Sequence, residues 1–177
     1  MLVMKLLIYT GIFLVCSAIG LIKSQKYTWR VEELKEFKNA LNMFKTKISF
    51  TFEPIPDIFA QISGSVSQNI SSIFRIASYN MQFFPAGDAW SKAMDADILN
   101  INSEDKKILK DLSKLLGKTD LNGQISQIEI TSSFLDEQIK KAEKEREKSE
   151  GMYRKLGMII GLGIIIILIW IHKKGNV

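Results

Sequence analysis

The chain has 177 residues, of which 46% are hydrophobic and 24% charged, and its formal net charge is +5. This length fits one modest domain with additional segments, and the near balance of charges in the middle of the chain argues against a nucleic-acid-binding protein. The single cysteine, Cys16, excludes a disulfide within the chain and a cysteine-rich metal site.

Two uncharged apolar segments lie near the ends of the chain, at residues 6–22 and 156–171. Each approaches the length that crosses the hydrocarbon core of a bilayer. We therefore predict transmembrane helices over residues 1–23 and 156–172, with a short tail at 173–177. The alternatives are a cleaved signal peptide for the first segment and a helix buried in a soluble core.

Basic residues flank the inner ends of both apolar segments. Lys23, Lys26 and Arg30 follow the first segment, and a basic run from Lys140 to Lys155 precedes the second, whereas the outer ends carry few basic residues. The positive-inside rule therefore predicts a two-pass protein of the cell membrane, with a cytoplasmic middle region and both termini extracytoplasmic.

Between these segments the hydrophobic pattern is helical. Apolar residues recur at steps of three and four from Leu34 to Ile48, and Pro54 is expected to follow the end of this helix. Pro56 is well placed as the first residue of a short helix that carries Ile58 and Ile62. A third helix is expected over residues 66–77.

The second half of the middle region continues this pattern. Residues 81–87 are expected to form a loop with buried aromatic side chains. Asp88 should then cap a short helix that carries Trp90. Ser103 is the expected N-cap of the next helix, which Gly117 should terminate.

The last helix is expected to begin after Thr119 or Asp120 and to continue into the second apolar segment. A strand at residues 127–131 is the alternative there, and Gly151 is the weakest point of the predicted helix. The sequence therefore predicts an all-α protein with a cytoplasmic bundle of about six helices between two membrane helices. The bundle should cover residues 24–142, and a charged helical stalk should cover residues 143–155.

No catalytic, cofactor-binding or metal-binding set of residues is visible in the sequence. The only histidine, His172, lies beyond the second apolar segment, and no Walker, dinucleotide-binding or zinc-protease motif occurs. The acidic residues of segment 143–149 alternate with basic ones, which disfavours a metal site. We therefore expect a protein that is not an enzyme and needs no cofactor.

Two features point to association with helices or proteins. Gly157 and Gly161 form a GxxxG motif, which favours close packing of membrane helices, either on the first apolar segment or between two copies of the chain. The charged residues Lys141, Glu145 and Lys148 form one candidate partner surface, although charged runs more often only solvate a helix. Exposed residues of the short helix that contains Trp90 form the other candidate.

Several short motifs occur in the order and spacing found in one known family. They are Pro54-Ile55-Pro56, Gly87-Asp88-Ala89-Trp90, the pattern formed by Leu116-Gly117, Asp120 and Gln124, and Lys155-Leu156-Gly157. Through these motifs nearly the whole chain resembles the stage III sporulation protein AB family of endospore-forming bacteria. Gly123 departs from the pattern, because an acidic residue is more usual at that position, and a looser helix start is expected there.

The resemblance implies a helical bundle similar to the cytoplasmic domain of type II secretion F proteins. It also implies a place in the complex between mother cell and forespore, in the mother-cell-derived outer forespore membrane. The implied partners are the stage III sporulation AA ATPase and other proteins of that complex. The expected function is therefore that of a non-enzymatic membrane platform. The main alternative is a membrane signalling protein that transmits conformational change through its last helix.

Overall fold

The structure is a computed structural model that describes the backbone of residues 2–51 and 53–174. Within these residues the chain forms helices and no strand, as the sequence predicts, and segment 127–131 is helical rather than extended. The elements are α1 (Leu2–Phe50), α2 (Ile55–Ser63), α3 (Gln68–Asn80), α4 (Ala86–Met94), α5 (Ser103–Asp111), the 3-10 turn η1 (Leu112–Lys114) and α6 (Leu121–Lys174).

The chain divides into two compact units, and α1 and α6 each contribute to both. One unit, here called the bundle, contains Trp29–Ala142, and the other, here called the helix pair, contains Met1–Thr28 and Glu143–Val177. Residues 24–28 thus group with the helix pair, although the sequence pattern assigns them to the bundle. In the part of the chain that the structure describes, no helix has both the length and the hydropathy needed to cross a membrane.

The core of the bundle forms where the apolar stripes of α1 and α6 are buried. Leu34, Phe37 and Leu41 of α1 are fully buried, as the spacing of three and four residues predicts, and Leu135 of α6 is fully buried with them. Outside this core, Lys38 pairs with Asp136 and Lys45 pairs with Glu129, so ion pairs also join the two helices.

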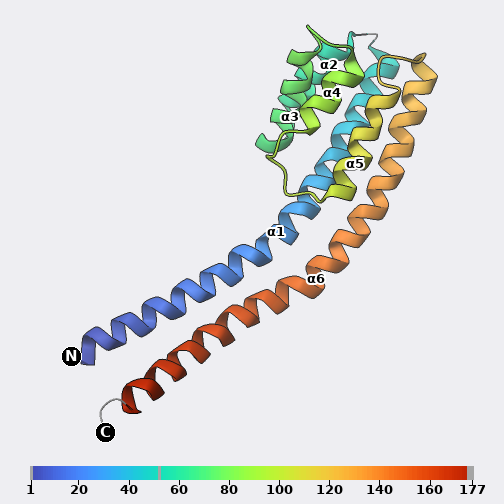
Figure 1. The fold of residues 1–177 in the computed structure, drawn as a ribbon. Coiled ribbons are helices and arrows are strands. Elements are labelled where there is room, and N and C mark those ends of the chain that lie inside the picture. Colours follow the sequence, from blue (N-terminus) through green and yellow to red (C-terminus); the bar gives the residue numbers. More distant parts are fainter. Residues whose placement is uncertain (1, 52, 175–177) are drawn as a thin grey trace. The chain divides into compact units, whose positions relative to one another are not determined.

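Helices α2, α3 and α4 form a group beside the bundle part of α1 (Figure 1). Their contacts centre on four aromatic side chains, Phe44, Phe59, Phe74 and Trp90, and the ring of Phe59 lies 5.0 Å from those of Phe44 and Phe74. Trp90 lies 5.6 Å from Phe59 and 5.3 Å from Phe74. Edge-to-face and tilted rings at these distances contribute attraction beyond the burial of apolar area.

The predicted starts of α2 and α4 differ from the structure by one and three residues, and α3 begins at Gln68 rather than at residue 66. Helix α4 begins at Ala86 after Pro85, so Asp88 lies in the first turn instead of capping the helix. Pro56 is likewise the second residue of α2 rather than the first. The reason is the same in both cases, since the residue before each helix is a proline, Pro85 or Pro54, whose carbonyl accepts the first helical hydrogen bonds.

The N-cap of α5 is Asn102 rather than Ser103. The Asn102 side chain accepts a hydrogen bond from the Asp105 amide at 2.8 Å, and Asp105 Oδ2 accepts one from the Asn102 amide at 3.0 Å. This reciprocal capping box satisfies two amides at once, which favours Asn102 over the hydroxyl of Ser103.

Helix α6 is continuous through Gly151, where the sequence has its weakest helical residue. At its start, Asp120 Oδ1 accepts a hydrogen bond from the Gly123 amide at 3.0 Å. A β-carbon at position 123 would lie 2.9 Å from the Thr119 side chain. Glycine therefore leaves room for the Thr119 and Asp120 side chains around a capped helix start.

Candidate interaction surfaces

The Gly87-Asp88-Ala89-Trp90 motif fixes α4 against the end of α5 and η1. Trp90 is fully buried, and its indole N–H donates to the Leu109 carbonyl oxygen at 2.7 Å. A β-carbon on Gly87 would lie 2.2 Å from the carbonyl oxygen of Ser113, which no side chain can tolerate. Gly87 and Trp90 therefore form a packing contact between helices, whereas Asp88 between them in sequence is exposed.

The motif of Leu116-Gly117, Asp120 and Gln124 builds the turn between η1 and α6. Gly117 adopts φ +71°, a conformation that favours glycine. Its amide donates to Gln124 Oε1 at 3.3 Å, and Gln124 Nε2 donates to the Thr119 carbonyl at 3.2 Å. Because Asp120 caps α6 in the same turn, all these residues position the start of α6.

Pro54 and Pro56 have a comparable role at the start of α2. The Pro54 carbonyl accepts hydrogen bonds from the amides of Asp57 and Ile58 at 3.0 and 3.1 Å. The Pro56 carbonyl accepts a hydrogen bond from the Ser78 hydroxyl at 2.9 Å, which connects α2 to α3. The prolines thus determine where α2 begins and how it contacts its neighbour.

A buried polar network that the sequence analysis did not identify connects α1 to the rest of the bundle. Arg30 Nε and Nη2 donate to the two carboxylate oxygens of Asp105 at 2.7 and 3.1 Å, and both residues are buried. Glu33 accepts hydrogen bonds from the Asn69 side chain at 3.0 Å and from the backbone amide and side chain of Asn100 at 2.6 and 2.8 Å. The sequence held one sign of this network: two charged residues, Arg30 and Glu33, stand beside Val31 and Leu34 in the apolar stripe of α1.

The side chains of this network are paired with groups of the same chain by these hydrogen bonds, which favours a role in packing. Among the described residues, no group of three histidine, cysteine, aspartate or glutamate side chains could hold a metal ion. The side chain of His172 lies outside the described part of the structure. The expectation that the protein is not an enzyme therefore stays a prediction.

The predicted charged surface is divided between the two units. Lys141 lies in the bundle, and its ammonium contacts Glu104 Oε1 at 3.1 Å, an oxygen that also accepts from Gln138 at 2.9 Å. The hydrogen bond from Lys141 is the main cause that holds the pKa of Glu104 below its ordinary value. Glu145 and Lys148 are exposed residues of the helix pair. Lys141 is thus engaged with α5.

The segment between α3 and α4 exposes its aromatic side chains, and the expectation of buried aromatics there was wrong. Phe83 is 64% exposed, and the centroid of its ring lies 5.6 Å from that of Tyr79, a residue of α3 that is 60% exposed. Lys92 of α4 lies over the ring of Phe84 at 3.3 Å. The core positions nearby are already filled by Phe59, Phe74 and Trp90, so these rings remain in solvent. We call Tyr79, Phe83, Phe84 and Lys92 the aromatic patch.

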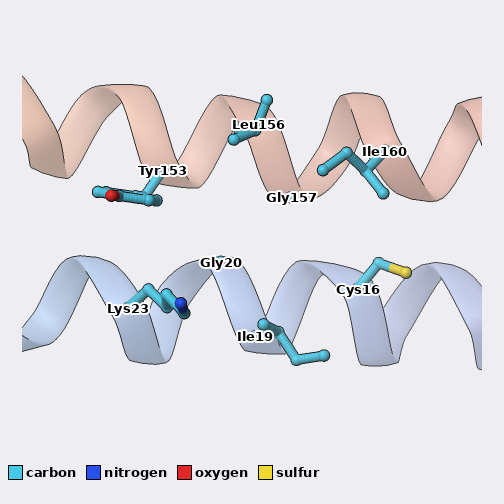
Figure 2. A pocket seen from close by; sticks show the side chains of 8 residues that line it. All are labelled: Cys16, Ile19, Gly20, Lys23, Tyr153, Leu156, Gly157 and Ile160. Carbon is cyan, nitrogen blue, oxygen red and sulfur yellow. The ribbon is translucent and has the colours of Figure 1, made fainter.

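Gly157 of the GxxxG motif lies against the first apolar segment of the same chain (Figure 2). A β-carbon on Gly157 would lie 2.9 Å from the Cys16 carbonyl oxygen and 3.1 Å from the Gly20 α-carbon. At Gly161 it would lie 3.2 Å from the Phe13 ring. Glycine is needed for this close approach, so within the chain the motif packs two helices together.

The geometry defines a class of protein: an all-helical protein, within the described residues, whose sequence motifs serve packing between helices. The chain belongs to the stage III sporulation protein AB family, because the family model with that description matches residues 5–169. This confirms the resemblance seen in the motifs.

Individual relatives agree with this assignment. The stage III sporulation protein AB of Bacillus subtilis (strain 168) is 24% identical over 155 residues, which cover 84% of this chain and 90% of that protein. A solved structure of stage III sporulation protein AB is similar in fold, with a TM-score of 0.64 and 21% identity. The match covers 68% of this chain and 98% of that one.

Proposed function

We propose that this protein is a non-enzymatic membrane platform component of the complex that links mother cell and forespore during sporulation. The observation that carries the proposal is the family match over residues 5–169, on a chain whose motifs all serve helix packing. Deletion of the gene should block sporulation after engulfment and leave vegetative growth intact. A normal spore yield in the deletion strain would refute the proposal.

The apolar parts of the helix pair, residues 1–23 and 156–172, are proposed to lie in the membrane, with the bundle and the charged stalk at residues 143–155 in the cytoplasm. Large apolar side chains on both of its helices are exposed, among them Leu14, Ile19, Ile159 and Ile166. Such a surface needs an apolar environment or a partner to cover it. The side chains of residues 1–6, 8, 9 and 168–177, which include parts of both predicted spans, lie outside the described part.

A topology reporter inserted beside Gly64, at the exposed end of α2, tests this orientation. The proposal expects cytoplasmic activity of the reporter, because the basic residues at the inner ends of the apolar segments favour that side. Extracytoplasmic labelling at this position would overturn both the orientation and any cytoplasmic partner. An expected location in the outer forespore membrane follows from the family and is tested by imaging a fluorescent fusion after engulfment.

The proposed cytoplasmic partner is the stage III sporulation AA ATPase, and the aromatic patch is the proposed contact surface. Aromatic side chains that are exposed together are typical of binding hot spots. The patch also includes Lys92 of the short helix α4, whereas the alternative charged surface has Lys141 already paired with Glu104.

Pull-down with the purified ATPase distinguishes these surfaces. Replacing Phe83 and Phe84 by serine should reduce binding at least about tenfold, the effect of losing about 1.4 kcal/mol of contact energy. Phe50→Ser is the matched control, because Phe50 is 77% exposed but lies outside the patch. Loss of binding on charge reversal at Lys141, Glu145 and Lys148, with binding retained in the serine variant, would assign the contact to the charged surface instead.

A second candidate function is signalling across the membrane through the last helix. The observation that favours it is the continuity of α6 over 54 residues, which belong to both units. A Gly151→Pro substitution removes a helical hydrogen bond in the middle of α6 and should interrupt this connection. If sporulation is unaltered in that variant, transmission through a rigid α6 is excluded, while the platform function is unaffected.

A further inference from the structure

An apolar groove of about 240 Å³ runs along the helix pair (Figure 2). Its walls are formed by Cys16, Ile19 and Gly20 of α1 and by Leu156, Gly157 and Ile160 of α6. It exists because Gly20 and Gly157 bring the two backbones into contact while they contribute no side chains of their own. Ile19, Leu156 and Ile160 are all exposed, so the groove is open to whatever surrounds the helices.

The polar groups of the groove gather at one end. Figure 2 shows Lys23 and Tyr153 together at the end opposite to Cys16 and Ile160. Lys23 is exposed, and no described residue forms an ion pair with it. Contact with the Tyr27 hydroxyl raises the pKa of Tyr153, so its hydroxyl stays protonated at neutral pH and can donate a hydrogen bond.

The occupant that fits this groove is amphiphilic, with an apolar chain and a negatively charged end. A cation that has no ion-pair partner among the described residues favours an anion, and an ammonium beside a neutral hydroxyl donor suits a phosphate oxygen. A zwitterionic head group would bring its own cation close to Lys23. Lys26 and Lys155, which are exposed and near the same end in sequence, add to the positive potential.

We propose that the groove binds one anionic phospholipid, whose phosphate contacts Lys23 and Tyr153 and whose acyl chain lies along Ile19, Leu156 and Ile160. This inference rests on the proposed membrane location of the helix pair. The lipid would fill the open groove beside the contact between Gly20 and Gly157. It would also hold the basic end of the helix pair at the level of the lipid head groups.

Native mass spectrometry of the full chain in detergent tests the proposal. The probes are phosphatidylglycerol and phosphatidylcholine with identical acyl chains, added in equal amounts. One phosphatidylglycerol per chain should be retained, at least about tenfold more strongly than phosphatidylcholine, which corresponds to about 1.4 kcal/mol. Equal retention of the two lipids would overturn the proposal.

Two variants distinguish specific binding of lipid in this groove from non-specific association of lipid with the helices. Lys23→Gln should abolish the preference for phosphatidylglycerol, whereas Lys107→Gln, at an exposed lysine of α5, should keep it. Ile160→Trp should reduce the retention of both lipids, because the larger ring fills the groove. An unchanged preference in Lys23→Gln would overturn the site.

Carbonate extraction of membranes keeps this result distinct from the proposed function. If the parent chain resists extraction but shows no lipid preference, the groove proposal fails and the membrane platform stands. If the parent chain is extracted as a peripheral protein, both proposals fail.

Discussion

The buried pair of Arg30 and Asp105 allows a sharp test of how α1 is held in the bundle. The Asp105 side chain is fully buried and that of Arg30 is 8% exposed, with two hydrogen bonds between them at 2.7 and 3.1 Å. Removing one partner of such a pair leaves a buried charge without compensation and typically costs about 3–5 kcal/mol. An Asp105→Asn substitution keeps the shape and an acceptor for the Asn102 amide, so we expect a loss near 3 kcal/mol.

The expected loss is large compared with the total stability of a domain of this size, which is about 5–15 kcal/mol. At about 4 °C per kcal/mol, the midpoint of thermal unfolding should fall by about 12 °C, measured by circular dichroism of the full chain in a mild detergent. Adding Arg30→Met to Asp105→Asn should recover part of the loss, because the unpaired cation is then absent.

The matched control is the exposed pair of Lys45 and Glu129, whose side chains are 38% and 57% exposed. Glu129→Gln should change stability by less than about 1 kcal/mol, since water screens such pairs. If Asp105→Asn also costs less than about 1 kcal/mol, burial does not strengthen the Arg30 contact and the reasoning is refuted.

Four further outcomes are expected. Trp90→Phe should lower the free energy of unfolding by about 2 kcal/mol in a denaturant titration, because the buried Leu109 carbonyl loses its donor; a change below about 0.5 kcal/mol would contradict this role. Gly117→Ala should cost about 1–2 kcal/mol through its φ of +71°, whereas Gly151→Ala, in a right-handed helix with open space around it, should be neutral or stabilising. Ser132→Ala should raise stability by about 0.5–1 kcal/mol, since the Ser132 hydroxyl is buried without a hydrogen-bond partner; destabilisation would show that the hydroxyl is satisfied in solution. The folded-state pKa of Glu104 is held below the ordinary value of 4.5. The stabilisation from its ionised carboxylate is therefore present above pH 4.5 and is lost as the pH falls through the lower pKa of the folded state. The stability difference between pH 7 and pH 3 should therefore shrink in Glu104→Gln, and an equal difference in both chains would argue against the contact with Lys141.

The helical class and the buried stripes were predictable because local spacing determines them. The steps of three and four residues from Leu34 to Ile48 identify the face of α1 that the structure buries. Helix starts were less predictable, since Asn102 and Ser103 are both good N-caps and only the reciprocal contact with Asp105 decides between them. That contact also depends on the partner of Asp105 on α1, Arg30, which is 75 residues away in sequence.

The interaction surfaces were harder to derive, because exposure depends on which residues fill the core first. Phe83 and Phe84 have the composition of core residues, yet Phe59, Phe74 and Trp90 occupy the available volume. The motif residues Gly87, Gly117 and Gln124 were singled out by resemblance, but their spacing did not reveal that they meet at one turn. Contacts between segments that are distant in sequence decide both which aromatic side chains stay exposed and where the motif residues meet.

The joining of α1 to α6 within the bundle has a consequence for biosynthesis. Lys38 and Asp136, which pair across these helices, are 98 residues apart, and Leu135 and Ala142 complete the core on the α6 side. While the ribosome is still making α6, the part of the apolar core that Leu135 and Ala142 complete has no cover. Nascent chains that stop before residue 142 should therefore be recognised by chaperones or proteases, and the bundle can close only near the end of translation.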